Sequence, residues 1–335
     1  MTYALWRPRP DIVQITLPNP GLPLPWALPC NVYVVLGQAP CLVNTGHPAQ
    51  REALVSALGQ LGIAPGNVER VVATDWSPEA LGNAALFEDA DLFVRSDDMR
   101  QPSFYGPVVD GWRERWQVLV GQLLENDEYR QAMNLEAHEA ALEAYFGGLP
   151  ERLNVVPLVD GHRLRLGRLD LVVVDAPGPA DGHMVLFEDK APEEQGILFG
   201  GRVVVEHAFG DQVLVDVKAM IETVERVFDL KPGLLLPTLG RVDESGTLAV
   251  RRVHRNMTSF LSNLPYVLQG PMTLPQILFR DMGYIPSDLT RYLGSLRRLQ
   301  VGFDELVRTA VLLTEGRGVW TRYGTSAPDP RVSRG

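Results

Sequence analysis

The first 250 residues alternate between short apolar runs rich in β-branched side chains and longer stretches with helical spacing. The runs predict strands at 31–37, 41–44, 68–73, 163–166, 169–175, 184–188, 197–199, 203–205 and 233–237. The helical spacing falls at 48–61, 112–146 and 213–228. Strands and helices thus alternate twice, which predicts a layered protein of sheets and helices.

The last eighty residues have a different pattern, in which helices dominate. Helical spacing is found at 254–264, 273–282, 287–299 and 303–313, and a short strand or wing follows at 316–323. This order is typical of a winged-helix-like module, which we place at 251–325. The tail at 326–335 has too few apolar residues to pack, so we expect it to be loose.

The composition is that of a soluble globular protein, with 45% hydrophobic and 21% charged residues. No run approaches the roughly 18 to 20 apolar residues that a membrane span needs, and no basic segment precedes an apolar one near residue 1. We therefore expect a cytoplasmic protein without a membrane partner. Cys30 and Cys41 lie in apolar surroundings, which favours core packing over redox or ligand chemistry.

Five short motifs carry the most specific information. They are L-V-N-T-G at 42–46, T-D-W-S-P-E-A-L-G at 74–82, D-A-P-G-P-A-D-G-H at 175–183, L-F-G-G-R at 198–202 and L-P-T-L-G at 236–240. Their order and spacing resemble those of the metallo-β-lactamase superfamily, whose motifs include L-I-D-T-G, T-H-x-H-x-D-H-x-G, T-P-G-H-x-x-G-H, F-x-G-D and P-x-H-G. Any one match is weak, but five in order are specific.

The resemblance implies an α+β fold, a four-layer αββα sandwich with a small, mainly helical C-terminal domain. The metallo-β-lactamase-like domain would cover residues 1–250 and carry a helical lid at about 103–148. Similar family members have a winged-helix-like module that packs over this domain, as we expect for residues 251–325.

In that family the motifs supply histidines and aspartates to one or two metal ions, usually zinc. We call the corresponding positions here the former metal-site positions. They are occupied by Asp75, Ser77, Glu79, Ala80, Pro179, Arg202 and Leu239. No histidine remains among them, and the aspartate of the first turn is replaced by Asn44.

A catalytic zinc needs about three protein ligands and an open position for water. Alanine, proline and leucine side chains have no lone pair to donate, and the permanent charge of Arg202 would repel a dication. We therefore predict no metal and no other cofactor. The expected protein is a pseudoenzyme that binds, scaffolds or regulates, and its partner is an unidentified small ligand or protein.

The substitutions also suggest what replaced the metal. Arg202 is predicted to enter the former metal pocket and pair with Asp75 or Glu79. The alternative is that these three charges are exposed at the mouth, where unpaired charges cost little. Beside them, the pocket is expected to be lined by Asn44, His47, Asp175 and His183.

Two other function classes remain open. A hydrolase with a relocated hard cation would use Asp75, Glu79, Asp175 or Asp181. A nucleic-acid binder would use arginines of the C-terminal part, which has a net charge of +6 within a chain of net charge -10. The candidates are Arg291, Arg297, Arg298, Arg308, Arg317 and Arg322. We favour nucleic acid least because the whole chain is acidic. The apolar lid and the appended helices favour a homodimer.

Overall fold

The computed structural model describes most of the chain, and everything below concerns those residues. They are 2–22, 28–95, 114, 117–150, 153–180, 182–188, 190, 196–203, 216–285 and 287–325. Asp181, the tail at 326–335 and lid residues 103–113, 115 and 116 lie outside them.

A seven-stranded sheet forms the first half of the larger body. Its strands lie in chain order: β1 (Ala4–Arg9), β2 (Ile12–Leu17), β3 (Cys30–Val35), β4 (Cys41–Val43), β5 (Arg70–Val72), β6 (Asp91–Arg95) and β7 (Val155–Leu158). The pairs from β1 to β4 are antiparallel and those from β4 to β7 are parallel. The loops after β4 and β5 therefore leave the sheet at the same edge.

A five-stranded sheet faces the first one. Its order is β12 (Leu234–Pro237), β11 (Ile197–Gly201), β10 (Met184–Glu188), β9 (Leu169–Asp175) and β8 (Arg163–Leu166). Inward-facing residues of both sheets pack into one cluster, including Tyr33 and Val43 on one side and Val173 and Phe199 on the other. The ring of Tyr33 meets that of Phe199 edge to face at 5.5 Å.

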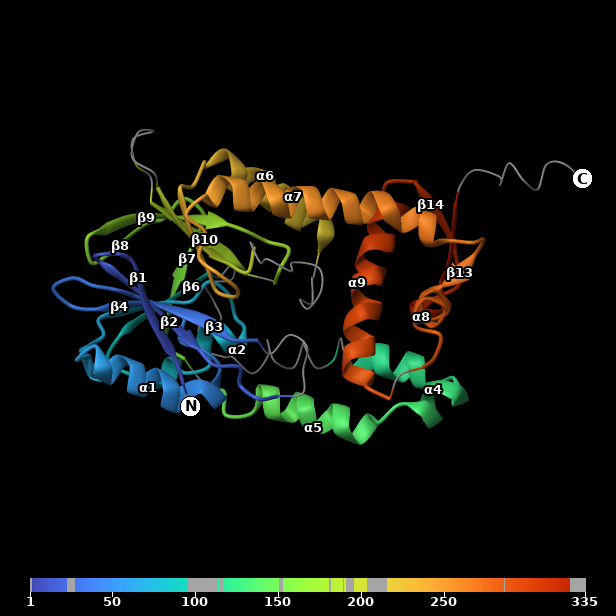
Figure 1. Cartoon of the computed structure of the whole chain (residues 1–335), viewed down its shortest axis with the longest axis horizontal. Coiled ribbons are helices and arrows are strands. Elements are labelled where there is room, and N and C mark those ends of the chain that lie inside the picture. The colour runs from blue at the N-terminus through green and yellow to red at the C-terminus, as the bar shows by residue number, and fades with distance from the viewer. Residues whose placement is uncertain are drawn as a thin grey trace, which may run out of the picture.

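Helices cover the outer faces of both sheets, as Figure 1 shows. On the first sheet lie α1 (Arg51–Gln60) and the short α2 (Pro78–Leu81); α6 (Val217–Asp229) and α7 (Gly246–Asn263) cover the second. The short 3-10 helices are η1 (Pro48–Gln50), η2 (Pro65–Asn67), η3 (Ala84–Leu86), η4 (Leu264–Val267) and η5 (Gly318–Trp320). The four layers are those of an αββα sandwich, so the predicted fold class is confirmed.

The lid and the C-terminal part share a second core. It joins helical residues 117–124, α4 (Asp127–Ala132) and α5 (Leu135–Phe146) to α8 (Leu274–Met282) and α9 (Leu289–Arg308). A small sheet of order β13 (Met272–Thr273), β15 (Arg322–Thr325) and β14 (Leu312–Glu315) completes it. We call this unit the second body; in Figure 1 it stands beside the sandwich, with α9 between α7 and α5.

The boundary proposed at residue 250 falls inside α7, which spans 246–263. Val250, Val253 and Met257 of this helix are buried in the core of the sandwich. The helix thus ties the two bodies together, because its first half packs on the sandwich and its last residues lead into the second body. Nowhere in the described ranges is a helix both long and apolar enough to cross a membrane.

Candidate functional site

Asn44 ties together three strand ends, those of β4 and β5 in the first sheet and that of β12 in the second. It follows β4 and adopts a φ of 64°, a backbone conformation that asparagine tolerates better than most residues. Its Nδ2 donates to Thr238 Oγ1 at 2.8 Å, and its Oδ1 accepts from the Thr74 backbone N–H at 2.9 Å. The side chain is 1% exposed, so it acts as a buried cross-link.

The predicted pair between Arg202 and Asp75 is present and buried. Arg202 Nε donates to Asp75 Oδ2 at 3.0 Å, and the side chains are 8% and 1% exposed. The other oxygen, Oδ1, accepts from the Ser77 backbone N–H at 2.8 Å. The alternative of exposed charges at the mouth is therefore wrong for Arg202 and Asp75.

Opposite charge governs the protonation of this pair. Burial alone would raise the pKa of Asp75, but Arg202, His183 and the Ser77 bonds outweigh it and hold that pKa below its ordinary value. Burial would likewise lower the pKa of Arg202, and the carboxylates of Asp75 and Glu79 raise it instead. Both groups are therefore charged at neutral pH, as a buried ion pair requires.

His183 lies against the same pair. Its Nε2 accepts from the Arg202 backbone N–H at 2.9 Å, so the neutral ring carries its proton on Nδ1. Gly201 makes this contact sterically possible, because a Cβ there would lie 2.4 Å from His183 Nε2.

Glu79 is 2% exposed and is met by a residue that the sequence did not single out. The hydroxyl of Tyr145, at the end of α5, lies 3.0 and 3.1 Å from the two Glu79 carboxylate oxygens. His47 Nε2 lies 2.8 Å from the Tyr145 carbonyl oxygen, and the two rings stack at 5.3 Å. No sequence signal beyond its place in the predicted lid pointed to Tyr145.

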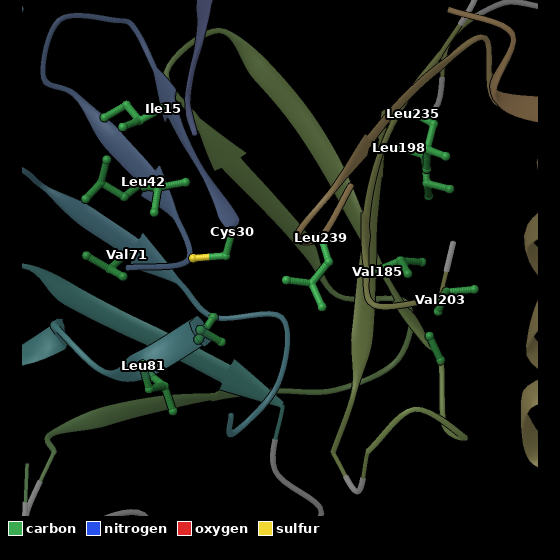
Figure 2. Packing of buried hydrophobic residues seen from close by; sticks show 14 of the residues in the cluster. Ile15, Cys30, Leu42, Val71, Leu81, Val185, Leu198, Val203, Leu235 and Leu239 are labelled. Carbon is green, nitrogen blue, oxygen red and sulfur yellow. The ribbon is translucent and has the colours of Figure 1, made fainter. Parts of the chain in front are cut away.

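The apolar former metal-site positions belong to the core. Ala80 is fully buried and Leu239 is 2% exposed, and both lie in the main hydrophobic cluster of the sandwich. Figure 2 shows Leu239 among these side chains, between Cys30 and Val185. Pro179 is buried too. Apolar side chains thus occupy positions at which the family has metal ligands.

Asp175 is separate from this cluster. Both of its carboxylate oxygens accept from the Arg95 guanidinium, with Nη2 at 2.7 Å from Oδ2. Of the acids that a relocated hard cation would use, Asp75 and Asp175 are bound to arginines, and Asp181 lies outside the described residues. Within the described ranges, no group of three or more His, Cys, Asp or Glu side chains is placed to hold a metal ion.

Acidification should destabilise the protein through its buried histidines. Burial lowers the pKa of His183 from 6.5 to about 4 and also lowers that of His47. The unfolded chain then binds more protons, so stability present above pH 6.5 is lost as pH falls towards 4, by at most about 1.4 kcal/mol per pH unit for His183. Urea unfolding between pH 7 and 5 measures this slope. His183→Gln, which cannot titrate, should have a shallower slope; equal slopes would contradict the assignment.

Comparison with known proteins supports the fold and the resemblance. No protein-family model matches the chain. The human metallo-beta-lactamase domain-containing protein 1 is 29% identical over 201 residues, covering 52% of this chain and 70% of that protein. The rat protein of the same name is 41% identical over 88 residues, which are 26% of this chain and 34% of the rat protein.

Two solved structures match along nearly the whole chain. A metallo-beta-lactamase family protein from Thermus thermophilus has a TM-score of 0.70 at 20% identity, covering 95% of this chain and 99% of its own. A beta-lactamase domain protein from Burkholderia ambifaria has a TM-score of 0.73 at 15% identity, covering 96% and 94%. At such identities the likeness concerns the fold alone, and it includes the second body. The fold is therefore that of the metallo-β-lactamase superfamily, and the sequence relatives support the resemblance that the motifs predicted.

Proposed function

We propose that this chain is a metal-free pseudoenzyme of the superfamily that acts as a binding, scaffolding or regulatory protein. The observation that carries the proposal is the buried Arg202–Asp75 pair at the former metal-site positions. A guanidinium at this place neutralises the carboxylate that a metal ion would otherwise have to neutralise.

The residues present do not fit the metal that the fold family implies. Both oxygens of Asp75 are already engaged, one with Arg202 and the other with the Ser77 N–H. The side chains of Ala80, Pro179 and Leu239 offer no lone pair, which leaves the Ser77 hydroxyl and the Glu79 carboxylate as donors beside the engaged Asp75, fewer than the roughly three protein ligands that a catalytic zinc needs. A dication placed beside Arg202 would also be repelled. No reaction step is therefore assigned to a metal.

The buried position of the former metal-site side chains favours binding of a partner at the protein surface over binding of a ligand at this centre. His47, Asp75, Glu79 and His183 are each at most 2% exposed, so they have little contact with a ligand from solvent in this conformation. That Asn44, His47, Asp175 and His183 line a pocket stays a prediction. Homodimer formation and a cytoplasmic location are also proposals that await experiment.

Elemental analysis of protein purified without added metal tests the proposal. We expect zinc, manganese and iron each far below one ion per chain. A bound ion at 100 times its Kd would raise the free energy of unfolding by about 2.7 kcal/mol. Adding zinc or manganese at millimolar concentration should therefore leave the urea midpoint unchanged. One ion per chain that survives dialysis would refute the proposal and favour a hydrolase with a relocated site.

Nucleic-acid binding is less well supported. Helix α9, the longest of the C-terminal part, packs against α5, α6, α7 and α8, so little of it is free to enter a groove. Arg308 pairs with Glu305, and Arg298 lies over the Phe260 ring at 5.7 Å. Arg317 and Arg322 are exposed. Binding to a DNA duplex at low salt that weakens steeply as salt rises would revive this alternative.

A further inference from the structure

Tyr145 connects the second body to the former metal-site positions through its side-chain hydroxyl and its backbone carbonyl. Its hydroxyl reaches the two carboxylate oxygens of Glu79 at 3.0 and 3.1 Å, and its carbonyl oxygen lies 2.8 Å from His47 Nε2. Glu79 lies in α2 (Pro78–Leu81), in the connection that follows β5, and His47 lies in the connection that follows β4. A single residue of the lid is thus held by both connections.

The direction of the His47 bond follows from its other nitrogen. His47 Nδ1 accepts from the Ala49 backbone N–H at 3.1 Å, so the proton lies on Nε2 and is donated to the Tyr145 carbonyl. This carbonyl lies in the last turn of α5 (Leu135–Phe146), where carbonyls have no partner within the helix. His47 therefore acts as the C-terminal cap of the lid helix.

The contact between Tyr145 and Glu79 stabilises a buried carboxylate. A buried carboxylate is costly unless donors satisfy its lone pairs. Arg202 Nε bonds Asp75, the first of the two buried acids, and the Arg202 charge also acts on Glu79, the second. The Tyr145 hydroxyl supplies a hydrogen bond to the second, and bonds of this charged type are stronger than neutral ones.

Tyr145 is itself anchored to the second body. It packs edge to face on Phe146 at 5.0 Å, and both residues belong to the core of that body. Elsewhere the lid joins the same body through Gln122, which accepts from the Val319 N–H and, with its carbonyl, from Trp320 Nε1. Displacing Tyr145 would therefore remove a contact between α5 and the sandwich, while α7 still ties the second body to it.

We infer that the former metal centre serves as the socket of an intramolecular latch, in which Glu79 and His47 hold Tyr145 and so keep α5 closed over the loops after β4 and β5. The inference rests on the proposed function, because Glu79 stands at a ligand position of the family and a bound metal would compete with Tyr145 for its oxygens. Access to the cluster is then controlled by release of this tyrosine.

Hydrogen exchange of the α5 amides tests the latch. In Tyr145→Phe the hydroxyl is lost while the ring stays, so exchange in α5 should rise about tenfold. In Glu79→Gln the acceptor oxygen stays but its charge is lost, so a smaller rise of about threefold is expected. Tyr266→Phe is the matched control, since Tyr266 is 85% exposed and should leave exchange unchanged. The amides of α1 serve as the internal reference.

The outcomes separate the latch from general instability. A rise in α5 with α1 unchanged supports the latch, as does the loss of the Tyr145→Phe effect in a Glu79→Ala background. Exchange in α5 within twofold of wild type, or an equal rise in α1 and α5, would overturn it. Metal analysis of the same samples keeps the two proposals apart. One ion per wild-type chain refutes the proposed function, whereas unchanged exchange in metal-free Tyr145→Phe protein overturns the latch alone.

Discussion

Replacing Arg202 by alanine should lower the free energy of unfolding by about 3–5 kcal/mol, because the substitution leaves the Asp75 carboxylate buried without a counter-charge. Asp75 is 2% exposed and cannot recover hydration without local unfolding. Urea denaturation at pH 7 measures the loss. If Asp75 takes up a proton in the variant, the deficit should shrink as pH is lowered towards its raised pKa.

Two variants make this result interpretable. Arg308→Ala removes an arginine whose pair with Glu305 is on the surface, where side-chain exposure of Arg308 is 51%, and should cost far less stability than Arg202→Ala. The double change Arg202→Met with Asp75→Leu removes both charges and should recover much of the stability lost in Arg202→Ala. A loss below 1 kcal/mol in Arg202→Ala would show that the pair does not hold the centre together.

Replacing Gly201 by alanine should destabilise the protein by about 2–5 kcal/mol. Gly201 has a φ of +54°, which strains a residue with a Cβ by roughly 1–2 kcal/mol. The added Cβ would also lie 2.4 Å from His183 Nε2 and 2.7 Å from its Cε1. The ring must then move, at a cost of about 1–3 kcal/mol for overpacking. The bond from the Arg202 N–H to His183 would be lost with it.

Gly59→Ala is the matched control for Gly201→Ala. Gly59 lies within α1, and a Cβ there meets nothing within 4 Å. Alanine is favoured over glycine inside a helix, so this change should stabilise the protein by about 0.5–1 kcal/mol. Equal effects of the two substitutions on the urea midpoint would mean that contact with His183 does not explain the need for glycine at 201.

Much of the fold follows from local patterns. The predicted strands at 169–175 and 184–188 coincide with β9 and β10, and the helix predicted at 213–228 corresponds to α6 at Val217–Asp229. These elements are buried on a face that repeats with the period of a strand or a helix, which a sequence displays directly. The layer order came from the motif resemblance, because pairing between distant strands leaves no local signal.

The packing of the lid could not be derived in this way. Tyr145 and Trp320 contribute to one core although they are far apart in the chain, and α7 runs across the boundary drawn at residue 250. Contacts of this kind depend on which apolar faces meet, and many faces of similar hydrophobicity would satisfy a sequence pattern equally well.

For the former metal-site positions, too, the sequence determined some properties and the tertiary structure determined others. Residue identity alone determined that Ala80, Pro179 and Leu239 cannot donate electron pairs, since that property belongs to the side chain wherever it lies. Whether Asp75 and Arg202 are exposed or paired depends on burial, and burial is a property of the assembled sandwich. Only the tertiary structure therefore decided that the two charges meet, and that Tyr145 rather than solvent satisfies Glu79.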